Sequence, residues 1–284
     1  MFIESIRHQH HQPPVALILG TGDIASAIAA DLFLSQWAVV MLRDEAMPVM
    51  RRGMAFDDAL EEGVAWLDGV WGTRAVEPEM LLTLARARES VVVSALDPAV
   101  VSAASLGLIT LLVDARMRKY APSGDLRSLA TCAIGVGPGF VAGQTVDIAI
   151  ETLPGQEGEV VSGGGTACPT GKSVPLGGVR EERFVCALTA GPWTPAAPLG
   201  GLVEAGAPLG RLGDVDLHAP IGGRVRGIVR PMPRGVARGC KLAEIDPRPG
   251  APITGVPPRA ERIAAGTSRA VRILLPVSHA SGMV

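Results

Sequence analysis

The sequence predicts an α/β protein in which a doubly wound parallel sheet is followed by a smaller β-rich domain. Three observations support this prediction: apolar runs alternate with helical patterns in the first half, the composition becomes rich in Gly and Pro near residue 154, and the chain repeats itself beyond residue 183. The chain has 284 residues, 48% of them hydrophobic, which is enough for about two domains with cores of their own.

The first predicted elements are a strand, a tight turn and a helix. Val15–Leu19 is a run of five apolar residues, and apolar residues at helical spacing follow the turn. Gly20, Gly22 and Ala25 have the G-x-G-x-x-A spacing of a dinucleotide-binding loop. In such a loop the backbone approaches a pyrophosphate, whose charge is stabilised by free N–H groups at the helix start. The residues expected to bind a nucleotide-type ligand here are Gly20, Thr21, Gly22, Asp23, Ile24 and Ala25.

The rest of the first half continues the alternation of strand and helix. Continuous apolar strands separated by helices indicate a parallel sheet that is covered on both faces. The segment "MAFDDALEEGVAWLDGV" fits a short helix followed by a hairpin. These patterns predict a Rossmann-like doubly wound domain over residues 13–150. The further expected strands are 37–42, 91–96, 108–115 and 131–136, and the expected helices are 77–87 and 98–105.

Residues 151–182 are predicted to connect the two domains, because their Gly and Pro content disfavours regular helices. Within them, "GTACPTGKS" resembles the phosphate-binding pattern G-x-x-x-x-G-K-S. However, five residues rather than four separate Gly165 from Gly171, no clear strand precedes the segment, and no apolar helix follows Ser173. The sequence therefore favours a Gly/Pro turn over a P-loop.

An internal repeat characterises the β-rich domain, which is predicted over residues 183–248. Two halves that share one signature are typical of a biotinyl/lipoyl-like barrel-sandwich. Carrier proteins of that kind bear their prosthetic group on a hairpin lysine, but this chain has Gly213 and Asp214 at that turn. We therefore expect a binding or docking module without biotin or lipoate, followed by a segment, 249–284, that packs back on the first domain. The two copies, offset by 33 residues, are Val203, Gly206, Leu209 and Leu212, then Val236, Gly239, Leu242 and Ile245.

Composition and charge argue against several classes of partner. A net charge of −2 gives no long-range attraction to nucleic acid or to anionic membranes. The longest uncharged apolar run, 99–113, is shorter than a membrane helix requires, and no signal-peptide pattern opens the chain, so we expect a cytoplasmic protein. The four cysteines lack zinc-site spacing, and His8, His10 and His11 lie in a loose N-terminal tail, so no metal site is expected.

The motifs of the chain, taken in order, resemble those of one family. "GTGDIASAIA", "LLVDARM", "IGVGPGF", "GGLVEAGAPLG" and "KLAEIDPR" are similar to motifs of the YqeB-type accessory proteins of selenium-dependent molybdenum hydroxylases, over about residues 15–275. These proteins resemble the Rossmann part of xanthine dehydrogenase accessory factors. The resemblance implies that the partner is a molybdenum hydroxylase client. It also implies a role in handling or inserting the molybdenum cofactor, with a molybdopterin dinucleotide as the nucleotide-type ligand.

Further candidate ligand-binding residues follow predicted strands, because open α/β sheets bind ligands outside the carboxyl ends of their strands. Asp114 and Arg116 follow one strand, and Gly135, Gly137 and Gly139 follow the next, where they offer a second close-approach backbone surface. The alternative interpretations are a mutual ion pair for the two charged residues and simple turn geometry for the glycines.

Two more candidates follow the strand 37–42. The family pattern has an acid at its end, whereas this chain has Arg43 and then Asp44. Arg43 suits a phosphate, and Asp44 could bind a ribose diol by a shift of one residue.

Three functions fit these residues. The first is an accessory protein that binds a nucleotide-type cofactor between the two glycine loops and docks on its client through the β-rich domain. The second is an NAD(P)-dependent oxidoreductase, although the predicted cleft offers no Ser/Tyr/Lys set and the chain has one tyrosine, Tyr120. The third is a non-catalytic binding module with a vestigial Rossmann fold. The residues leave the choice between catalysis and binding open.

Overall fold

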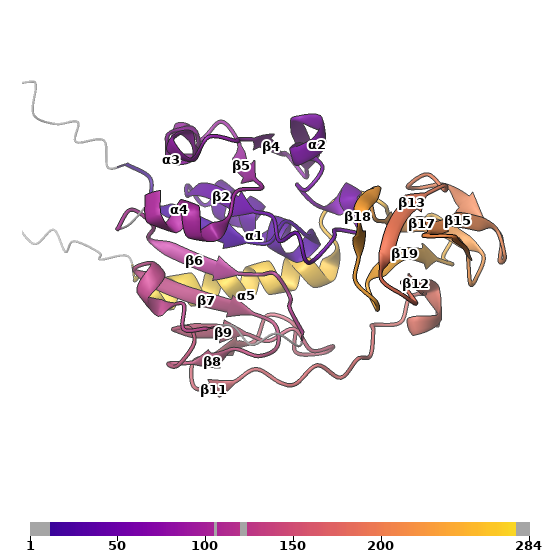
Figure 1. Ribbon diagram of the computed structural model, residues 1–284. Coiled ribbons are helices and arrows are strands. Elements are labelled where there is room, and N and C mark those ends of the chain that lie inside the picture. Colours follow the sequence, from indigo (N-terminus) through magenta and orange to yellow (C-terminus); the bar gives the residue numbers. More distant parts are fainter. Residues whose placement is uncertain (1–11, 105–106, 120–123, 277–284) are drawn as a thin grey trace, which may run out of the picture.

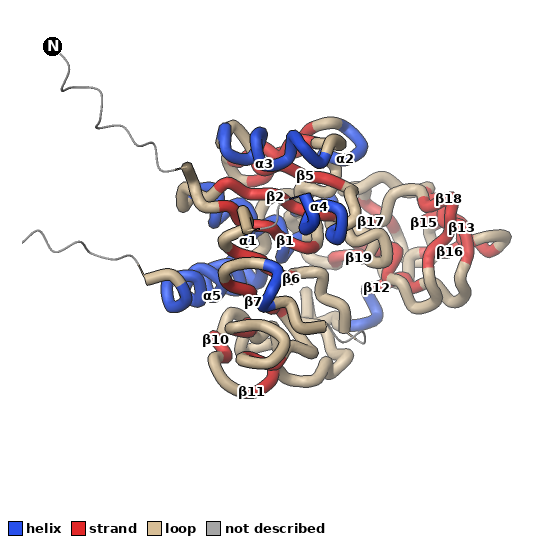
Figure 2. The backbone as a smooth tube through the Cα atoms, turned by 60° about the vertical axis from the view of Figure 1, so that its left-hand side comes forward, coloured by secondary structure: helices blue, strands red, loops and turns tan. Residues whose placement is uncertain are grey.

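The computed structural model describes residues 12–104, 107–119 and 124–276 as two regions (Figure 1). A nine-stranded mixed sheet with helices on both faces forms the first region, and two four-stranded antiparallel sheets form the second (Figure 2). A small sheet of β8 (Val141–Ala142) and β11 (Gly164–Gly165) lies beside the first region. The predicted α/β class is confirmed. His8, His10, His11, Ser105 and Tyr120 lie outside the described residues.

The large sheet is parallel throughout its interior, and only its edge strands are antiparallel to their neighbours. Its central strand is β1, from which the chain builds first one side of the sheet and later the other. Across the sheet the strands are β10 (Val160–Val161), β9 (Ile148–Ile150), β7 (Cys132–Val136), β6 (Leu111–Asp114), β1 (Val15–Leu19), β2 (Ala38–Leu42), β5 (Val91–Ser94), β4 (Val70–Arg74) and β3 (Val64–Leu67).

Helices cover both faces of this sheet. One face packs against α1 (Asp23–Leu34) and α5 (Pro258–Leu274), and the other packs against α3 (Pro78–Ala87) and α4 (Pro98–Ala104). Alternate side chains of β1 belong to the two different cores, so the strand is apolar on both sides. The segment from residue 249, expected to return to the first domain, supplies α5, which lies along α1 (Figure 1).

Most elements predicted for the first half are present, with ends that differ by a few residues. The predicted strand 108–115, for example, is shorter in the structure, where β6 spans Leu111–Asp114. The predicted helix and hairpin form α2 (Ala59–Glu62), β3 and β4. Their turn contains Asp68 and Gly69, both with positive φ, as a two-residue hairpin loop requires.

The sequence does not predict the short strands β8, β10 and β11. Two of them lie in the segment 151–182, whose composition predicts only a connection between the domains: β10 pairs with β9, and β11 pairs with β8. Each has two residues, too few to show the alternation of apolar side chains from which strands are predicted. The remainder of the segment runs to the second region and ends in η3 (Glu181–Arg183).

The two antiparallel sheets of the second region enclose one core. Its largest member is Trp193, which is buried and donates its Nε1–H to the Val229 carbonyl oxygen at 3.1 Å. One sheet has the order β12 (Phe184–Cys186), β19 (Lys241–Asp246), β17 (Gly223–Ile228), β14 (Leu202–Val203), and the other has the order β16 (Val215–His218), β15 (Pro208–Leu212), β13 (Gly191–Pro195), β18 (Met232–Val236).

The sequence repeat is also a structural repeat. Moving each strand by one repeat turns the order of one sheet into the order of the other. Gly206 and Gly239 occupy equivalent turns, with φ of +84° and +83°. Their N–H groups donate to the carbonyl oxygens of Ala219 and Ala187, both at 2.8 Å. The signature glycines therefore provide the same left-handed turn in each copy.

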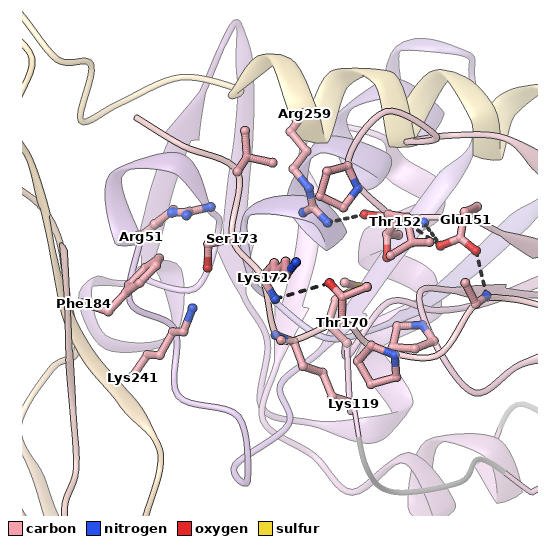
Figure 3. Close-up of a pocket in the computed structure, with 18 of the residues that line it drawn as sticks. Arg51, Lys119, Glu151, Thr152, Thr170, Lys172, Ser173, Phe184, Lys241 and Arg259 are labelled. Carbon is pink, nitrogen blue, oxygen red and sulfur yellow. Dashed lines mark hydrogen bonds between the residues drawn. The ribbon is translucent and has the colours of Figure 1, made fainter. Parts of the chain in front are cut away.

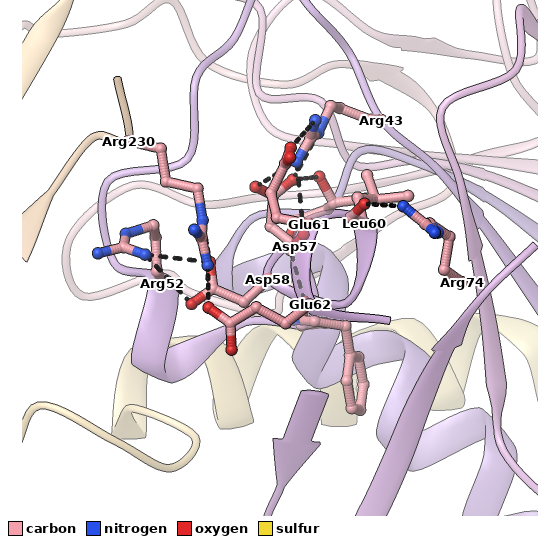
Figure 4. Close-up of polar contacts among 12 residues, drawn as sticks. Arg43, Arg52, Asp57, Asp58, Leu60, Glu61, Glu62, Arg74 and Arg230 are labelled. Atoms are coloured by element: carbon pink, nitrogen blue, oxygen red, sulfur yellow. Dashed lines mark hydrogen bonds and ion pairs between the residues drawn. The ribbon is translucent and has the colours of Figure 1, made fainter. Parts of the chain in front are cut away.

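Hydrogen bonds and ion pairs join the two regions. The N–H of Ile228 in β17 donates to the Met50 carbonyl oxygen at 2.8 Å. Arg230 pairs with Asp58 at 3.0 Å and also contacts Glu62 (Figure 4). These contacts fix the second region against the segment that connects β2 to β3.

Candidate functional site

The glycine loop connects β1 to α1 at the carboxyl edge of the large sheet. Gly20 has a φ of +107°, and a Cβ atom there would lie 3.0 Å from the Ala115 carbonyl oxygen, so the turn requires glycine. Gly22 has an ordinary φ of −71°, and a Cβ atom on it would have no neighbour within 4 Å. Gly20 therefore shapes the loop, whereas Gly22 leaves the space in front of it open.

Asp23 and Thr21 connect this loop to charged neighbours. Asp23 begins α1, accepts the N–H of Ile24 at 3.1 Å and pairs with Arg51 at 2.8 Å. The Thr21 hydroxyl donates to the Asp57 carboxylate at 2.5 Å. Because Arg51 offsets the charge of Asp23, an anionic ligand can share the positive helix start with this carboxylate.

A cleft of about 230 Å³ lies in front of the loop. Residues 20–25 and 115–117 form one wall, and the segment 47–51 forms another. Phe184 and Lys241 reach it from the second region. We call it the glycine-loop cleft. Of the residues predicted from the sequence, it brings together Gly20, Thr21, Gly22, Asp23, Ile24, Ala25, Asp44 and Arg116.

Arg43 and Asp44 have different partners. Arg43 pairs with Asp57 at 3.0 Å and with Glu61 at 2.9 Å, and it does not line the glycine-loop cleft (Figure 4). Asp44 lines the cleft and pairs with Arg118 at 2.6 Å. Burial acts to raise the pKa of Asp44, but the hydrogen bonds from Arg118 and from the Ala46 N–H, together with the charges of Arg118 and Arg116, outweigh it and lower that pKa. A wider hollow of about 670 Å³, also lined by both residues, lies along the ends of β1, β2 and β5.

Asp114 and Arg116 form an ion pair at the end of β6. Asp114 is 2% exposed, and its Oδ1 accepts the Nε–H of Arg116 at 2.9 Å and the backbone N–H at 3.2 Å. The same D-x-R arrangement recurs at 125–127 and 246–248, so it is a local turn motif of this protein. Of the three arginines, Arg116 lines the glycine-loop cleft.

The three glycines after β7 serve packing and turn geometry. A Cβ atom on Gly135 would lie 2.2 Å from the ring of Phe140. Gly137 has a φ of +98°, and a Cβ atom there would lie 2.8 Å from the sulfur of Met117. Gly139 has a positive φ and open space around it. None of the three lines the glycine-loop cleft, so the structure does not place them opposite the first loop.

Sequence motifs do not predict the buried ion-pair network that connects the glycine loop to the second region. Glu244 of β19 is fully buried and pairs with Arg51 at 2.7 Å and with Arg183 at 2.9 Å. Arg51 also reaches Asp23, so one guanidinium contacts both regions. Burial acts to raise the pKa of Glu244, but Arg51 and Arg183 lower it to about 2. The one signal in the sequence is an acid inside the apolar strand "KLAEI".

A second pocket, of about 190 Å³, adjoins the glycine-loop cleft (Figure 3). All three lysines of the chain line it, as does Arg259 of α5. We call it the lysine pocket. It shares with the glycine-loop cleft Arg51, Met117, Phe184 and Lys241, so the two hollows adjoin each other where the two regions meet.

The "PTGKS" segment forms part of the lysine pocket. Gly171 has a φ of +73°, and the next helical element after Ser173 is η3, a single 3-10 turn. Residues 166–175 are irregular, so the segment forms neither the strand–loop–helix arrangement of a P-loop nor a defined turn. The segment nevertheless brings Lys172 to a cationic pocket, which its spacing alone does not predict.

Within the described part of the chain, no three His, Cys, Asp or Glu side chains lie close enough together to hold a metal ion. Over the same residues, no helix combines the length and the apolar character needed to cross a membrane.

Comparison with known proteins gives weak structural matches and an informative sequence match. No family model matches the chain. Two solved structures are similar to parts of the chain. An aspartoacylase family protein from Mesorhizobium loti is 12% identical and covers 84% of the chain. The ectoine utilization protein EutE (DoeB) from Ruegeria pomeroyi is 14% identical and covers 82% of the chain. The match covers 86% and 85% of those chains, with TM-scores of 0.26 and 0.27, which are too low to support an argument.

The informative match is to a protein of Escherichia coli (strain K12) described as uncharacterized protein YqeB. The identity is 31% over 263 residues, and the match covers 92% of this chain and 48% of that protein. The chain is thus similar, over most of its own length, to about half the length of YqeB.

Proposed function

We propose that the protein is a cytoplasmic accessory protein that binds a nucleotide-type cofactor in the glycine-loop cleft and aids the maturation of a molybdenum hydroxylase. The observation that supports ligand binding in this cleft is the position of Gly22. Gly22 is the N-cap residue of α1 and offers no side-chain capping hydrogen bond, it lines the cleft, and it leaves open space where a Cβ atom would lie. A phosphate group can therefore approach the backbone at a positive helix start.

The strand order supports a ligand at this position. β1 has β2 on one side and β6 on the other, so the chain reverses its direction of sheet growth at β1. Ligands of open α/β sheets bind at such switch points. We accordingly interpret the first region as a Rossmann-like domain and the second as a barrel-sandwich of the biotinyl/lipoyl type. The hairpin turn between β15 and β16 contains Gly213 and Asp214, so the proposal assigns no biotin or lipoate to it.

The position of the second region favours the handling of a cofactor. Phe184 and Lys241 complete the cleft, so a ligand there contacts both regions, and its release is coupled to the contact between them. A protein that passes a cofactor to a client needs such coupling. The YqeB-type motifs support a molybdenum hydroxylase as client and a molybdopterin dinucleotide as ligand. An NAD(P)-dependent oxidoreductase, the second candidate, would use the same cleft and would differ in the ligand.

Mass spectrometry of the ligand extracted from purified protein tests this function. A pterin dinucleotide is the expected result. A nicotinamide would favour the oxidoreductase. If neither is found and neither NAD⁺ nor NADP⁺ binds in calorimetry, the first region is a vestigial domain and the proposal is wrong.

The Gly22→Val variant tests the location of the ligand. Its side chain would enter open space, so folding should be unaffected while the extracted ligand is lost. Gly163→Val is a matched control, because Gly163 is also without neighbours within 4 Å and does not line the cleft. Co-expression with a molybdenum hydroxylase should show less cofactor and lower activity in the client for Gly22→Val alone. Equal ligand content in the two variants would place the ligand elsewhere.

A further inference from the structure

Cationic side chains from four segments that are distant in the sequence converge on the lysine pocket. Lys119 follows β6, Lys172 lies between β11 and η3, Lys241 is on β19, and Arg259 is in the first turn of α5. Figure 3 shows them around one hollow, with Arg51 at its edge. The chain has three lysines in 284 residues, so their meeting in one pocket is not a consequence of general basicity.

The acids near this pocket are already occupied. Glu151 is buried, and its carboxylate accepts backbone N–H groups of Thr152 at 2.6 Å and of Ala167 at 2.8 Å. Glu244 is held by Arg51 and Arg183. Over the described residues, no carboxylate lies within 4.0 Å of the cationic nitrogens of Lys119, Lys172, Lys241 or Arg259.

Holding these cations together without counter-charges is unfavourable in a partly buried site. Lys241 shows the effect: burial and the neighbouring Lys119 lower its pKa to about 8. Its Nζ lies 3.4 Å from the centroid of the Phe184 ring, which holds the amine at the junction of the two pockets. An anion in the pocket would relieve the repulsion, so the site has a built-in preference for one.

We propose that the lysine pocket binds a phosphate group of a small phosphorylated ligand. Its volume of about 190 Å³ is several times that of a single water molecule, about 30 Å³, so a phosphate fits. Lysine ammonium groups bind phosphate as point charges, and the hydroxyl-bearing residues Thr152, Thr170 and Ser173 also line the pocket.

Two sources of this phosphate fit the geometry. It can be the second anionic group of a ligand whose first lies at the glycine loop, since the two pockets adjoin and share four lining residues; this form rests on the proposed function. It can also be free pyrophosphate, which binds independently of the glycine loop.

Calorimetry with inorganic pyrophosphate tests the site itself. Lys119→Met and Lys172→Met should each weaken binding about tenfold, because each removes one charged donor. Both lysines are exposed, so their replacement should leave the melting temperature unchanged. Arg211→Met is the control: Arg211 is an exposed cation on β15, in the sheet of β16, β15, β13 and β18, and it does not line the lysine pocket, so its replacement should have no effect. Absence of pyrophosphate binding, or equal affinity in all four proteins, would overturn the proposal.

ADP titrations in the presence and absence of pyrophosphate identify the source. Mutual competition that Gly22→Val removes assigns the phosphate to a ligand that spans both pockets, and independent binding assigns it to a separate anion; both results support the site. If Gly22→Val leaves ADP affinity unchanged while the lysine variants weaken pyrophosphate binding, the proposed function fails and the lysine pocket remains. If the lysine variants have no effect, the lysine pocket fails whatever ADP does.

Discussion

The glycine-loop cleft and the lysine pocket lie side by side and share four lining residues, yet the cations that line them differ in whether they are paired with carboxylates. In the cleft, Arg51 and Arg116 are paired with the carboxylates of Asp23, Glu244 and Asp114. In the lysine pocket, the described residues provide no carboxylate partner for the lysines or for Arg259. Paired charges fix the position of loops and regions, whereas unpaired charges of one sign create a preference for a ligand.

Glu244→Gln should have the largest effect on stability, because it would leave Arg51 and Arg183 without their buried counter-charge. We expect the free energy of unfolding to fall by about 3–5 kcal/mol, as for other broken buried ion pairs. Chemical denaturation would measure it. Asp216→Asn, at an exposed pair with Arg211, should change stability by less than about 0.5 kcal/mol. Similar small losses in both variants would show that the network does not hold the regions together.

The stabilising effect of Glu244 should also depend on pH. Its pKa is lowered from 4.5 to about 2 on folding, so its contribution is present above pH 4.5 and is lost as the pH falls through 2. The loss should amount to about 3 kcal/mol. The difference in unfolding free energy between the wild type and Glu244→Gln should therefore narrow between about pH 5 and pH 2. A difference that stays constant over this range would contradict the assignment.

Asp114→Asn should have a moderate effect, and the repeated D-x-R motif provides its control. Asp114 is 2% exposed, so weakening its pair with Arg116 should cost about 1–3 kcal/mol. Asp125→Asn alters the same arrangement with Arg127 at an exposed position, where solvent screens the pair, so its loss of stability should be clearly smaller. Thermal unfolding compares the two. Equal losses would mean that burial does not distinguish the motifs.

The smallest expected effect is on the pH dependence of anion binding at Lys241. Its pKa of about 8 means that the amine loses its charge as the pH rises through 8. Sulfate, whose own charge is constant over this range, should bind a few-fold more weakly at pH 9 than at pH 7. Lys241→Met should bind more weakly at pH 7 and lose this dependence. A dependence that persists in the variant would assign the titration to another group.

Local sequence features predict the parts of the molecule that are built from neighbouring residues. The strand, turn and helix around Gly22 are contiguous, and their apolar spacing and glycines determine each element. The hairpin at Asp68 and Gly69 and the repeat at Gly206 and Gly239 depend on similar short-range signals. For these elements the sequence predicts both the structure and its position.

The charged networks and the lysine pocket could not be predicted in this way. Lys119 and Arg259 are separated by 140 residues, and no local pattern shows that they face one hollow. Gly135 and Gly137 show the reverse problem: their motif suggests a binding turn, but Phe140 and Met117 fill the space beside them. Which neighbour a side chain contacts depends on packing between distant segments. The spacing of residues along the chain does not predict such contacts.

Equivalent positions in the two copies of the repeat differ where one of them faces the first region. The equivalents of Lys241 and Glu244 in the other copy, 33 positions earlier, are Pro208 and Arg211, both exposed. The signature leucines and glycines are common to the two copies, and the residues that face the first region are not. Each sheet combines strands of both copies, so a gene duplication in which single strands later acquire contacts with the first region would leave this asymmetry. β15 then shows what the scaffold needs without those contacts, and residues transferred to its exposed positions from β19 should leave the fold intact.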